Sequence, residues 1–249
     1  MREVAAIGKG GHVLLSRRRA VAAVLVLFAA ATAGCSDLDD PGQGLARNDL
    51  VSDLAAQMSG AAALTYEASY HLSGGGTATV AQAQAPTRSA YVYPGGKVTV
   101  TTDATTLCDT GANATTCTMT APATPTSPPP AKVFEGADAT GMVLPSTVQA
   151  LLNAAVLDND VEVVQHDTTI AGRHATCVRL AGVDGAATRD FTTCITNEGA
   201  LGSFSGFLNS VRVEVAMTHY AEKVADEMFE VPKKAKLVDR RAQAGGDRP

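Results

Sequence analysis

Tryptophan is absent from the sequence, and aromatic residues make up only 4% of its 249 residues. The apolar positions are occupied mainly by Ala, Val, Leu and Met. Small side chains of this kind either fill a narrow core or leave space for an apolar ligand. The part of the chain after residue 35 also lacks an apolar run of the roughly 20 residues that span a bilayer as a helix. We therefore do not expect a membrane-spanning helix there.

Familiar catalytic motifs are missing from the same part of the sequence. It contains no Walker loop, no His-Glu-x-x-His and no Ser-x-x-Lys, and in Gly202–Gly206 the central Phe204 stands where a nucleophile elbow needs serine. The histidines lie in separate predicted strands without the close spacing of metal ligands; they are His71, His166, His174 and His219. We predict that the protein is not an enzyme and that it needs no cofactor and no metal.

The N-terminus has the three parts of a secretion signal. Arg17–Arg19 precede an uncharged run from Ala20 to Thr32, which ends in Ala33, Gly34 and Cys35. The run is shorter than a membrane-spanning helix, so we expect cleavage and assign residues 1–34 to a signal peptide. The alternative is an ordinary cleaved signal followed by an incidental cysteine.

This segment resembles the bacterial lipobox, although Thr32 stands where that motif usually has Leu. The resemblance implies that Cys35 becomes the first mature residue and is lipidated, with acyl chains such as palmitate. Two or more acyl chains attach a protein stably to a membrane. We therefore expect a lipoprotein of the cell membrane, located at the outer, extracytoplasmic face of the cytoplasmic membrane.

Removal of the signal makes the protein more acidic. The full chain has a net charge of −5, and residues 1–34 contain five basic residues and one acidic residue. The mature chain then has 15 basic and 24 acidic residues and a net charge of −9. Nucleic acid is excluded as a partner, because phosphate binding needs a concentrated basic surface.

The four remaining cysteines predict two disulfides. An even number of cysteines in an exported protein favours disulfide bonds, and four cysteines allow about three connectivities. Each of two pairs brackets a turn-rich segment between β-like runs, which favours Cys108 with Cys117 and Cys177 with Cys194. A metal site is the alternative, but neither pair has the short spacing of a zinc knuckle.

The chain after Cys35 begins with a helix and continues with strands. Residues 35–47 are acidic and contain glycine, which is typical of a flexible spacer. Apolar residues at helical spacing predict a helix over residues 49–59. Alternating patterns then predict strands at 64–72, 77–84, 88–93, 97–102, 105–108 and 116–119, followed by a proline-rich loop at 121–131.

The second half of the chain also begins with a predicted helix and continues with strands. Ser146 and Gln149 match a capping box at the start of an amphipathic helix. Strands follow at 161–166, 173–180, 189–196 and 211–218. If Cys177 faces Cys194, the hairpin is symmetric about Gly185 and Ala186, which predicts a two-residue turn with positive φ at Gly185. The same register places the disulfide on the polar face of the sheet. Residues 229–232 close the domain, and the basic residues 233–249 predict a disordered tail.

The order of elements, the Gly172–Cys177 stretch and the Phe229–Pro232 segment resemble the LolA-like superfamily, and within it the LppX/LprG-type actinobacterial lipoproteins. The resemblance covers residues 48–232. It implies an α+β fold in which an incomplete antiparallel β-barrel of about eleven strands is covered by two or more helices. It also implies that a lipid occupies the cavity of the half-barrel.

We therefore expect a membrane-anchored protein that binds or carries a lipid or another hydrophobic ligand. The candidate cavity residues are the apolar members of the predicted strands and second helix: Tyr66, Tyr70, Leu151, Leu152, Val178, Leu180, Phe191, Ile195, Val213, Val215 and Met217. The alternative is a non-catalytic regulatory or interaction module that binds another envelope protein. A purely structural role in the envelope is a third interpretation.

Overall fold

The structure is a computed structural model that describes residues 41–124 and 129–242, with side chains from residue 47 onward. The predicted signal peptide and Cys35 lie outside these residues. Among the described residues, no helix has both the length and the apolar character needed to cross a membrane.

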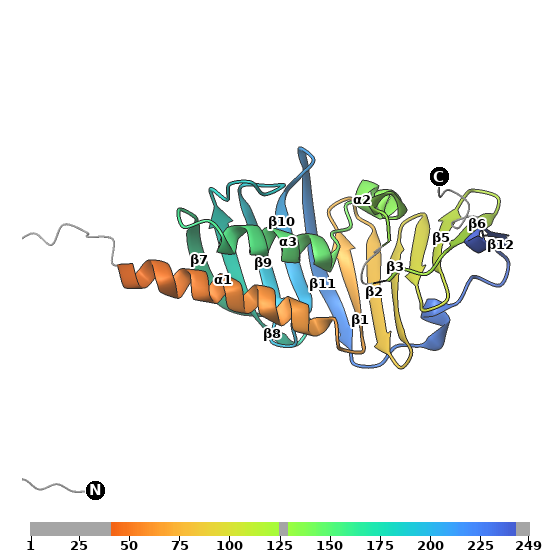
Figure 1. The fold of residues 1–249 in the computed structure, drawn as a ribbon, viewed down its shortest axis with the longest axis horizontal. Helices are drawn as coiled ribbons and strands as arrows, with labels where there is room; N and C mark the ends of the chain where they lie inside the picture. Colours follow the sequence, from red (N-terminus) through yellow and green to blue (C-terminus); the bar gives the residue numbers. More distant parts are fainter. Residues whose placement is uncertain (1–40, 125–128, 243–249) are drawn as a thin grey trace, which may run out of the picture. The chain divides into compact units, whose positions relative to one another are not determined.

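The strands form one open sheet (Figure 1). It has 12 strands in the order β12-β6-β5-β4-β3-β2-β1-β11-β10-β9-β8-β7. Neighbours are antiparallel except for β12 and β6, which are parallel. The strands are β1 (Tyr66–Leu72), β2 (Thr77–Gln84), β3 (Thr87–Tyr93), β4 (Gly96–Val100), β5 (Thr105–Thr110), β6 (Thr115–Thr120), β7 (Glu162–Ile170), β8 (Arg173–Ala181), β9 (Phe191–Thr196), β10 (Leu201–Leu208), β11 (Val211–Ala221) and β12 (Lys236–Asp239).

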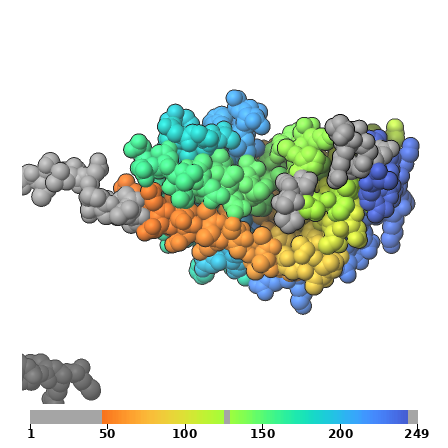
Figure 2. Space-filling view, viewed as in Figure 1, coloured from red at the N-terminus to blue at the C-terminus, as the bar shows by residue number. Residues whose placement is uncertain are grey.

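Three helices cover one face of this sheet, which we call the inner face. They are α1 (Pro41–Ala61), α2 (Glu135–Ala139) and α3 (Pro145–Val156), and a short 3-10 helix, η1 (Ala131–Val133), precedes α2. Figure 2 shows α1 and α3 side by side, and in Figure 1 both helices lie in front of the strands. This arrangement confirms the predicted fold class, an incomplete antiparallel barrel covered by helices.

Side chains of the sheet fix the end of α1. The Gln82 amide donates hydrogen bonds to the carbonyl oxygens of Ala61 and Leu64 at 2.8 and 2.9 Å. The Gln84 amide donates to the carbonyl of Ala62 at 2.8 Å. The last carbonyls of a helix have no partner within the helix, so these two glutamines satisfy the C-terminus of α1 and hold it against β2.

The C-terminal segment covers part of the opposite, outer face. The 3-10 helix η2 (Asp226–Phe229) packs Phe229 against Ala81, Ala83 and Ala90. The guanidinium of Arg88 lies 4.2 Å from the centre of the Phe229 ring. The chain then continues to β12, which pairs with β6 at one edge of the sheet. The other edge strand is β7, which pairs with β8 alone among the described residues.

Both predicted disulfides are present, Cys108–Cys117 and Cys177–Cys194. The predicted hairpin register is also confirmed, since Cys177 faces Cys194 and Leu180 faces Phe191. Gly185 has the expected positive φ of 73°. The predicted two-residue turn was wrong, however, because β8 ends at Ala181, β9 begins at Phe191, and a longer loop joins the two strands.

Core packing and a distant carboxylate explain this longer loop. Val183 points inward and is 0% exposed. The backbone N–H of Asp184 donates to Oδ2 of Asp158 at 2.8 Å, and the N–H of Gly182 donates to Oδ1 of Asp190 at 3.1 Å. The loop therefore folds over the end of the sheet instead of extending the hairpin.

Four further predictions differ from the structure. α1 starts at Pro41, within the predicted flexible spacer, and extends beyond residues 49–59. The capping box at Ser146 was wrong, because α3 starts with Pro145 and Leu144 is its N-cap without a side-chain hydrogen bond. The strand β10 was not predicted. Residues 236–239 form β12, so disorder was wrong for this part of the predicted tail.

Candidate ligand-binding grooves

The structure brings all eleven predicted cavity residues together in one core cluster. They lie on the inner face of the sheet and on α3, in contact with α1. The tyrosine hydroxyl of Tyr70 donates a hydrogen bond to the carbonyl of Leu201 at 2.9 Å. None of the eleven is more than 5% exposed. These side chains therefore fill the space between sheet and helices where the sequence predicted a cavity.

A groove opens instead at one end of the helix-covered side, and we call it the mouth groove. Its volume is about 570 Å³. It lies between the α2–α3 connection and the turn that joins β10 to β11. Its apolar walls are formed by Ala139, Met142, Val143, Leu208, Val211 and Val213. Val213 is the one predicted cavity residue that lines this groove.

Local backbone geometry shapes both walls of the mouth groove. In the β10–β11 turn, Asn209 and Ser210 both have positive φ, 50° and 66°, as in a type I′ hairpin turn. This turn lets the two strands continue close together to the tip, where Val211 is 64% exposed. On the opposite wall Gly141 has a φ of 78°, and a Cβ there would lie 3.4 Å from Val213. The glycine thus brings the α2–α3 connection close to β11.

The rim of the mouth groove is polar. It includes Ser73, Asp138, Thr147 and Arg212. Burial raises the pKa of the Asp138 carboxyl, and the neighbouring carboxylate of Glu135 raises it further. Apolar walls with a few polar groups at the rim are typical of a site that takes an apolar chain with a polar end.

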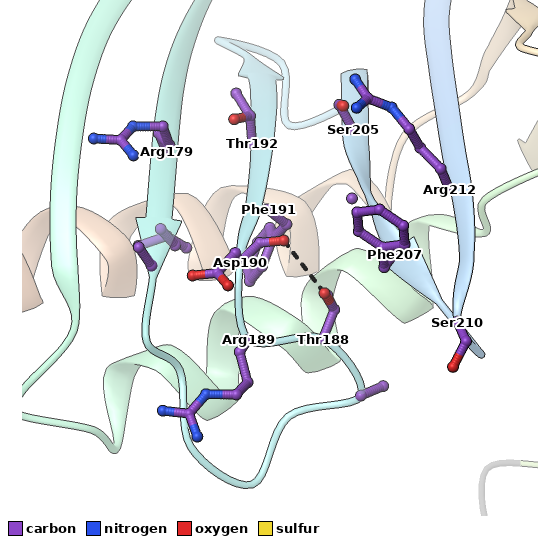
Figure 3. A pocket seen from close by; sticks show the side chains of 14 residues that line it. Arg179, Thr188, Arg189, Asp190, Phe191, Thr192, Ser205, Phe207, Ser210 and Arg212 are labelled. Carbon is purple, nitrogen blue, oxygen red and sulfur yellow. Dashed lines mark hydrogen bonds between the residues drawn. The ribbon is translucent and has the colours of Figure 1, made fainter.

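A second groove lies on the outer face, and we call it the arginine groove (Figure 3). Its volume is about 550 Å³. It is lined by Arg179, Arg189 and Arg212, together with Asp190 and the exposed ring of Phe207. Hydroxyl groups also belong to the lining, those of Thr188, Thr192, Ser205 and Ser210. Two of the predicted cavity residues, Leu180 and Phe191, line this groove as well.

Each of the three arginines pairs with a carboxylate that does not line the arginine groove. Arg179 donates to Glu162 at 3.1 Å, and Arg189 pairs with Asp184 at 3.0 Å. The Nε of Arg212 donates to Glu214 at 2.9 Å. The hydrogen bond from Arg212 lowers the pKa of the Glu214 carboxyl. Because these pairs are exposed, they contribute little to stability and leave the guanidinium groups accessible.

The two grooves adjoin each other at the β10–β11 turn. Arg212 and Ala187 line both of them. Arg212 is the residue opposite Phe207 across the hairpin, and the neighbouring Val213 points to the inner face. Alternation along β11 therefore places the cation of Arg212 on the outer face and the apolar side chain of Val213 on the inner face.

The histidines lie apart, as their sequence positions predict. His166 and His174 are on neighbouring strands at the β7 edge, and His71 and His219 are on β1 and β11. In the part of the chain with described side chains, no group of three or more His, Cys, Asp or Glu residues is placed to hold a metal ion.

Comparisons with known proteins find similarity in fold alone. No family model matches the chain, and no curated protein is significantly similar in sequence. An uncharacterized conserved protein from Thermus thermophilus is 8% identical with a TM-score of 0.46, over 77% of this chain and 99% of that one. MucB is 12% identical with a TM-score of 0.47, over 76% of this chain and 66% of that one. In the Pseudomonas aeruginosa MucA/MucB complex the match is 11% identical with a TM-score of 0.45, over 73% and 61%.

Proposed function

We propose that the protein is a non-catalytic, lipid-anchored binding protein of the extracytoplasmic membrane face, and that it takes the acyl chain of a lipid in the mouth groove. The observation that supports this proposal is the groove itself, about 570 Å³ with walls that include Met142, Val143 and Val211. Binding pockets for small apolar ligands have volumes of roughly 300–1,000 Å³.

The exposure of Val211 also supports an apolar ligand. A valine that is 64% exposed at the tip of a hairpin contributes little to the packing of the domain. It faces Leu208 across the hairpin, and both residues line the mouth groove. An acyl chain in the groove would remove this apolar surface from water, which favours binding by about 25 cal/mol per Å².

The proposed anchor keeps the groove near a source of lipid. Cys35 precedes Pro41, the first residue of α1, by six residues. At no more than about 3.5 Å per residue, these residues span about 20 Å or less. The domain would therefore stay close to the bilayer surface.

Photo-crosslinking in membranes tests the proposal. The full chain would be produced in bacterial membranes with a fatty acid that carries a diazirine and an alkyne, and labelled peptides would be mapped by mass spectrometry. We expect labels within residues 139–143 and 208–213. Val211→Asp should reduce this labelling, because a charge on the wall opposes burial of an acyl chain.

Val164→Asp is the matched control, because Val164 is also an exposed valine on a strand, 43% exposed, and lies at the β7 edge away from the groove. It should leave labelling unchanged. Equal labelling of both variants and the parent chain would reject the mouth groove as the lipid site.

A second candidate function is supported by the β7 edge. This strand has nine residues, and seven of them are exposed. An edge strand presents unpaired backbone N–H and C=O groups to solvent, so an extended segment of a partner protein can add to it as a further strand. The protein would then act as an interaction module of the envelope.

Hydrogen exchange distinguishes this function from lipid binding. Benzoylphenylalanine would replace Gln165, an exposed residue of β7, so that a partner protein can be recovered by crosslinking. When this partner is then added to the protein, amide exchange in β7 should slow. The same replacement at Lys236, exposed in β12, serves as control. Unchanged exchange in β7 on addition of the partner would reject strand addition.

A further inference from the structure

We infer that the β12 edge of the sheet binds the surface of an anionic bilayer, so that the domain is held to the membrane at two places. The first place is the anchor of the proposed function, on which this inference rests; it does not depend on the acyl site in the mouth groove. The second place is a group of exposed cations at the opposite edge of the sheet. We call this group the basic edge; it consists of Lys233, Lys234, Lys236 and Arg240.

Positive charge gathers at the basic edge although the chain as a whole is acidic. Residues 231–242 contain five basic residues and one acidic residue, a net charge of +4, whereas the full chain has a net charge of −5. The acidic residue, Asp239, pairs with Arg241 at 2.6 Å. The four cations of the basic edge form no ion pair with any described side chain. Their charges are therefore available to an external anion.

The acidic residues that precede the basic edge have cations of their own. Asp226 pairs with Arg88. Glu230 lies beside Lys97, whose Nζ donates a hydrogen bond to the Glu230 carbonyl oxygen at 2.8 Å. Even if Glu227 is counted against the basic edge, three of its four positive charges remain.

Protection of the sheet edge explains only one of these cations. Lysine on an edge strand opposes pairing with another chain, and Lys236 in β12 can serve this purpose. Lys233 and Lys234, however, lie before the strand, in a turn that the backbone N–H of Ala235 closes with a hydrogen bond of 2.8 Å. Arg240 follows the strand. Three of the four cations therefore need another explanation.

The composition of the basic edge suits a charged surface better than a single anion. Three of its cations are lysines, whose ammonium groups are hydrated point charges on flexible stems and lack the paired donors with which arginine holds one phosphate. Leu237, among them, is 49% exposed and adds an apolar side chain that the interfacial region of a bilayer can take up. Each Lys or Arg close to an anionic bilayer strengthens binding about fivefold.

The two attachment places lie at opposite edges of the sheet. β12 is the first and β7 the last strand in the sheet order, and α1 begins beyond β7 (Figure 1). At about 4.8 Å between strands, the two edges lie up to about 50 Å apart. An anchor before α1 alone lets the β12 edge move away from the bilayer, and the net charge of −9 of the mature chain repels an anionic surface. The basic edge opposes this repulsion, so the sheet lies along the membrane.

Energy transfer to the bilayer tests the inference. The full chain, with its own anchor, would be reconstituted in vesicles of phosphatidylcholine alone or with added phosphatidylglycerol, each with an acceptor dye on the lipid headgroups. A fluorescent amino acid would replace Asn113, an exposed residue of the turn before β6, the strand that pairs with β12. We expect transfer to rise with phosphatidylglycerol and to fall again in about 1 M salt, where the screening length is about 3 Å.

Removal of the cations should abolish this response, since each one contributes about fivefold to binding. The test variant is Lys233→Gln, Lys234→Gln, Lys236→Gln, Arg240→Gln. The matched control removes the same charge from four exposed cations elsewhere and should keep the response; it is Lys132→Gln, Arg179→Gln, Arg189→Gln, Lys223→Gln.

A second label position separates this inference from the proposed function. The same fluorescent amino acid at Gln165, in the β7 edge beside the start of α1, should show transfer in both kinds of vesicle, because the anchor holds this edge. Transfer at Gln165 without a response to phosphatidylglycerol at Asn113 would overturn the role of the basic edge and leave the anchor intact. An equal response in the test and control variants would do the same. Absence of transfer at Gln165 would instead reject the anchor of the proposed function, and this inference with it.

Discussion

Gly199, in the turn between β9 and β10, lies against the backbone of Gln57 in α1: a Cβ added at Gly199 would lie 2.1 Å from the carbonyl oxygen of Gln57. No real Cβ approaches an oxygen this closely. The φ of Gly199 is +91°, which also disfavours any other residue. The contact sets how near α1 can lie to the sheet.

Gly199→Ala should therefore destabilise the protein by about 3 kcal/mol or more, since it combines a backbone clash with an unfavourable φ. Urea unfolding followed by circular dichroism measures the change. Gly172→Ala is the control, because Gly172 has a φ of +78° but nothing within 4 Å of an added Cβ. It should cost only about 1 kcal/mol. If both variants lose the same free energy of unfolding, the close contact of Gly199 with α1 does not contribute to the cost of the substitution.

Removal of the Cys177–Cys194 disulfide should destabilise the protein without changing the register of the hairpin. The bridge closes a segment of 17 residues, for which the chain-entropy relation gives about 3 kcal/mol. The Cys177→Ala, Cys194→Ala variant tests this by urea unfolding. The corresponding variant of Cys108–Cys117, with a separation of 9, should lose about 0.5 kcal/mol less. A larger loss for the shorter loop would contradict the entropic explanation.

The register of this hairpin could be predicted from sequence because two cysteines and one glycine agree on a single alignment. The loop that joins its strands could not, since Val183 is buried by residues of other elements and Asp158 accepts a hydrogen bond from Asp184 across a sequence separation of 26. Such long-range contacts leave no local pattern. The disulfide positions and the inner-face residues were therefore predicted, whereas the course of the loop was not.

The same reasoning explains the unpredicted parts of the site. In β10, Gly202 and Gly206 interrupt the alternation around Phe204, so the strand lacks a clear pattern. A Cβ at Gly206 would lie 3.0 Å from the Phe191 and Phe204 side chains, so a larger residue there would have to displace these side chains. The mouth groove combines β10 with the α2–α3 connection, far away in sequence. One feature of the site could be predicted from the sequence: the alternating pattern of residues 211–218 places Arg212 and Val213 on opposite faces of the strand.

Burial of the tyrosines predicts loss of stability at high pH. Burial raises the pKa of both Tyr66 and Tyr70, and neighbouring tyrosines raise these values further. A phenol with a raised pKa in the folded state keeps its proton when the unfolded state loses it. Its contribution is therefore complete below about pH 10, the pKa of an unfolded tyrosine, and is lost as the pH rises above that value.

Tyr70→Phe tests this explanation. At about pH 8 the variant should be less stable by about 1 kcal/mol, because it loses the hydrogen bond to Leu201. Above about pH 10 the stability of the variant should fall less steeply than that of the parent, and the two slopes should differ by up to about 1.4 kcal/mol per pH unit. Urea unfolding between about pH 8 and pH 11 measures both effects, together with tyrosinate absorbance. Parallel curves for parent and variant would rule out Tyr70 as a source of the pH dependence.

The C-terminal segment should stabilise the outer face mainly through Phe229, because this ring is 8% exposed and contacts the guanidinium of Arg88. Phe229→Ala should cost about 3 kcal/mol, since it removes a buried aromatic side chain. It should also expose residues 222–242 to limited proteolysis, because η2 connects this segment to β2 and β3. Leu237→Ala is the matched control, as Leu237 is 49% exposed in β12 and its truncation should change stability by less than about 1 kcal/mol. Rapid cleavage of the Leu237 variant but not of the Phe229 variant would mean that β12, and not Phe229, holds the segment in place.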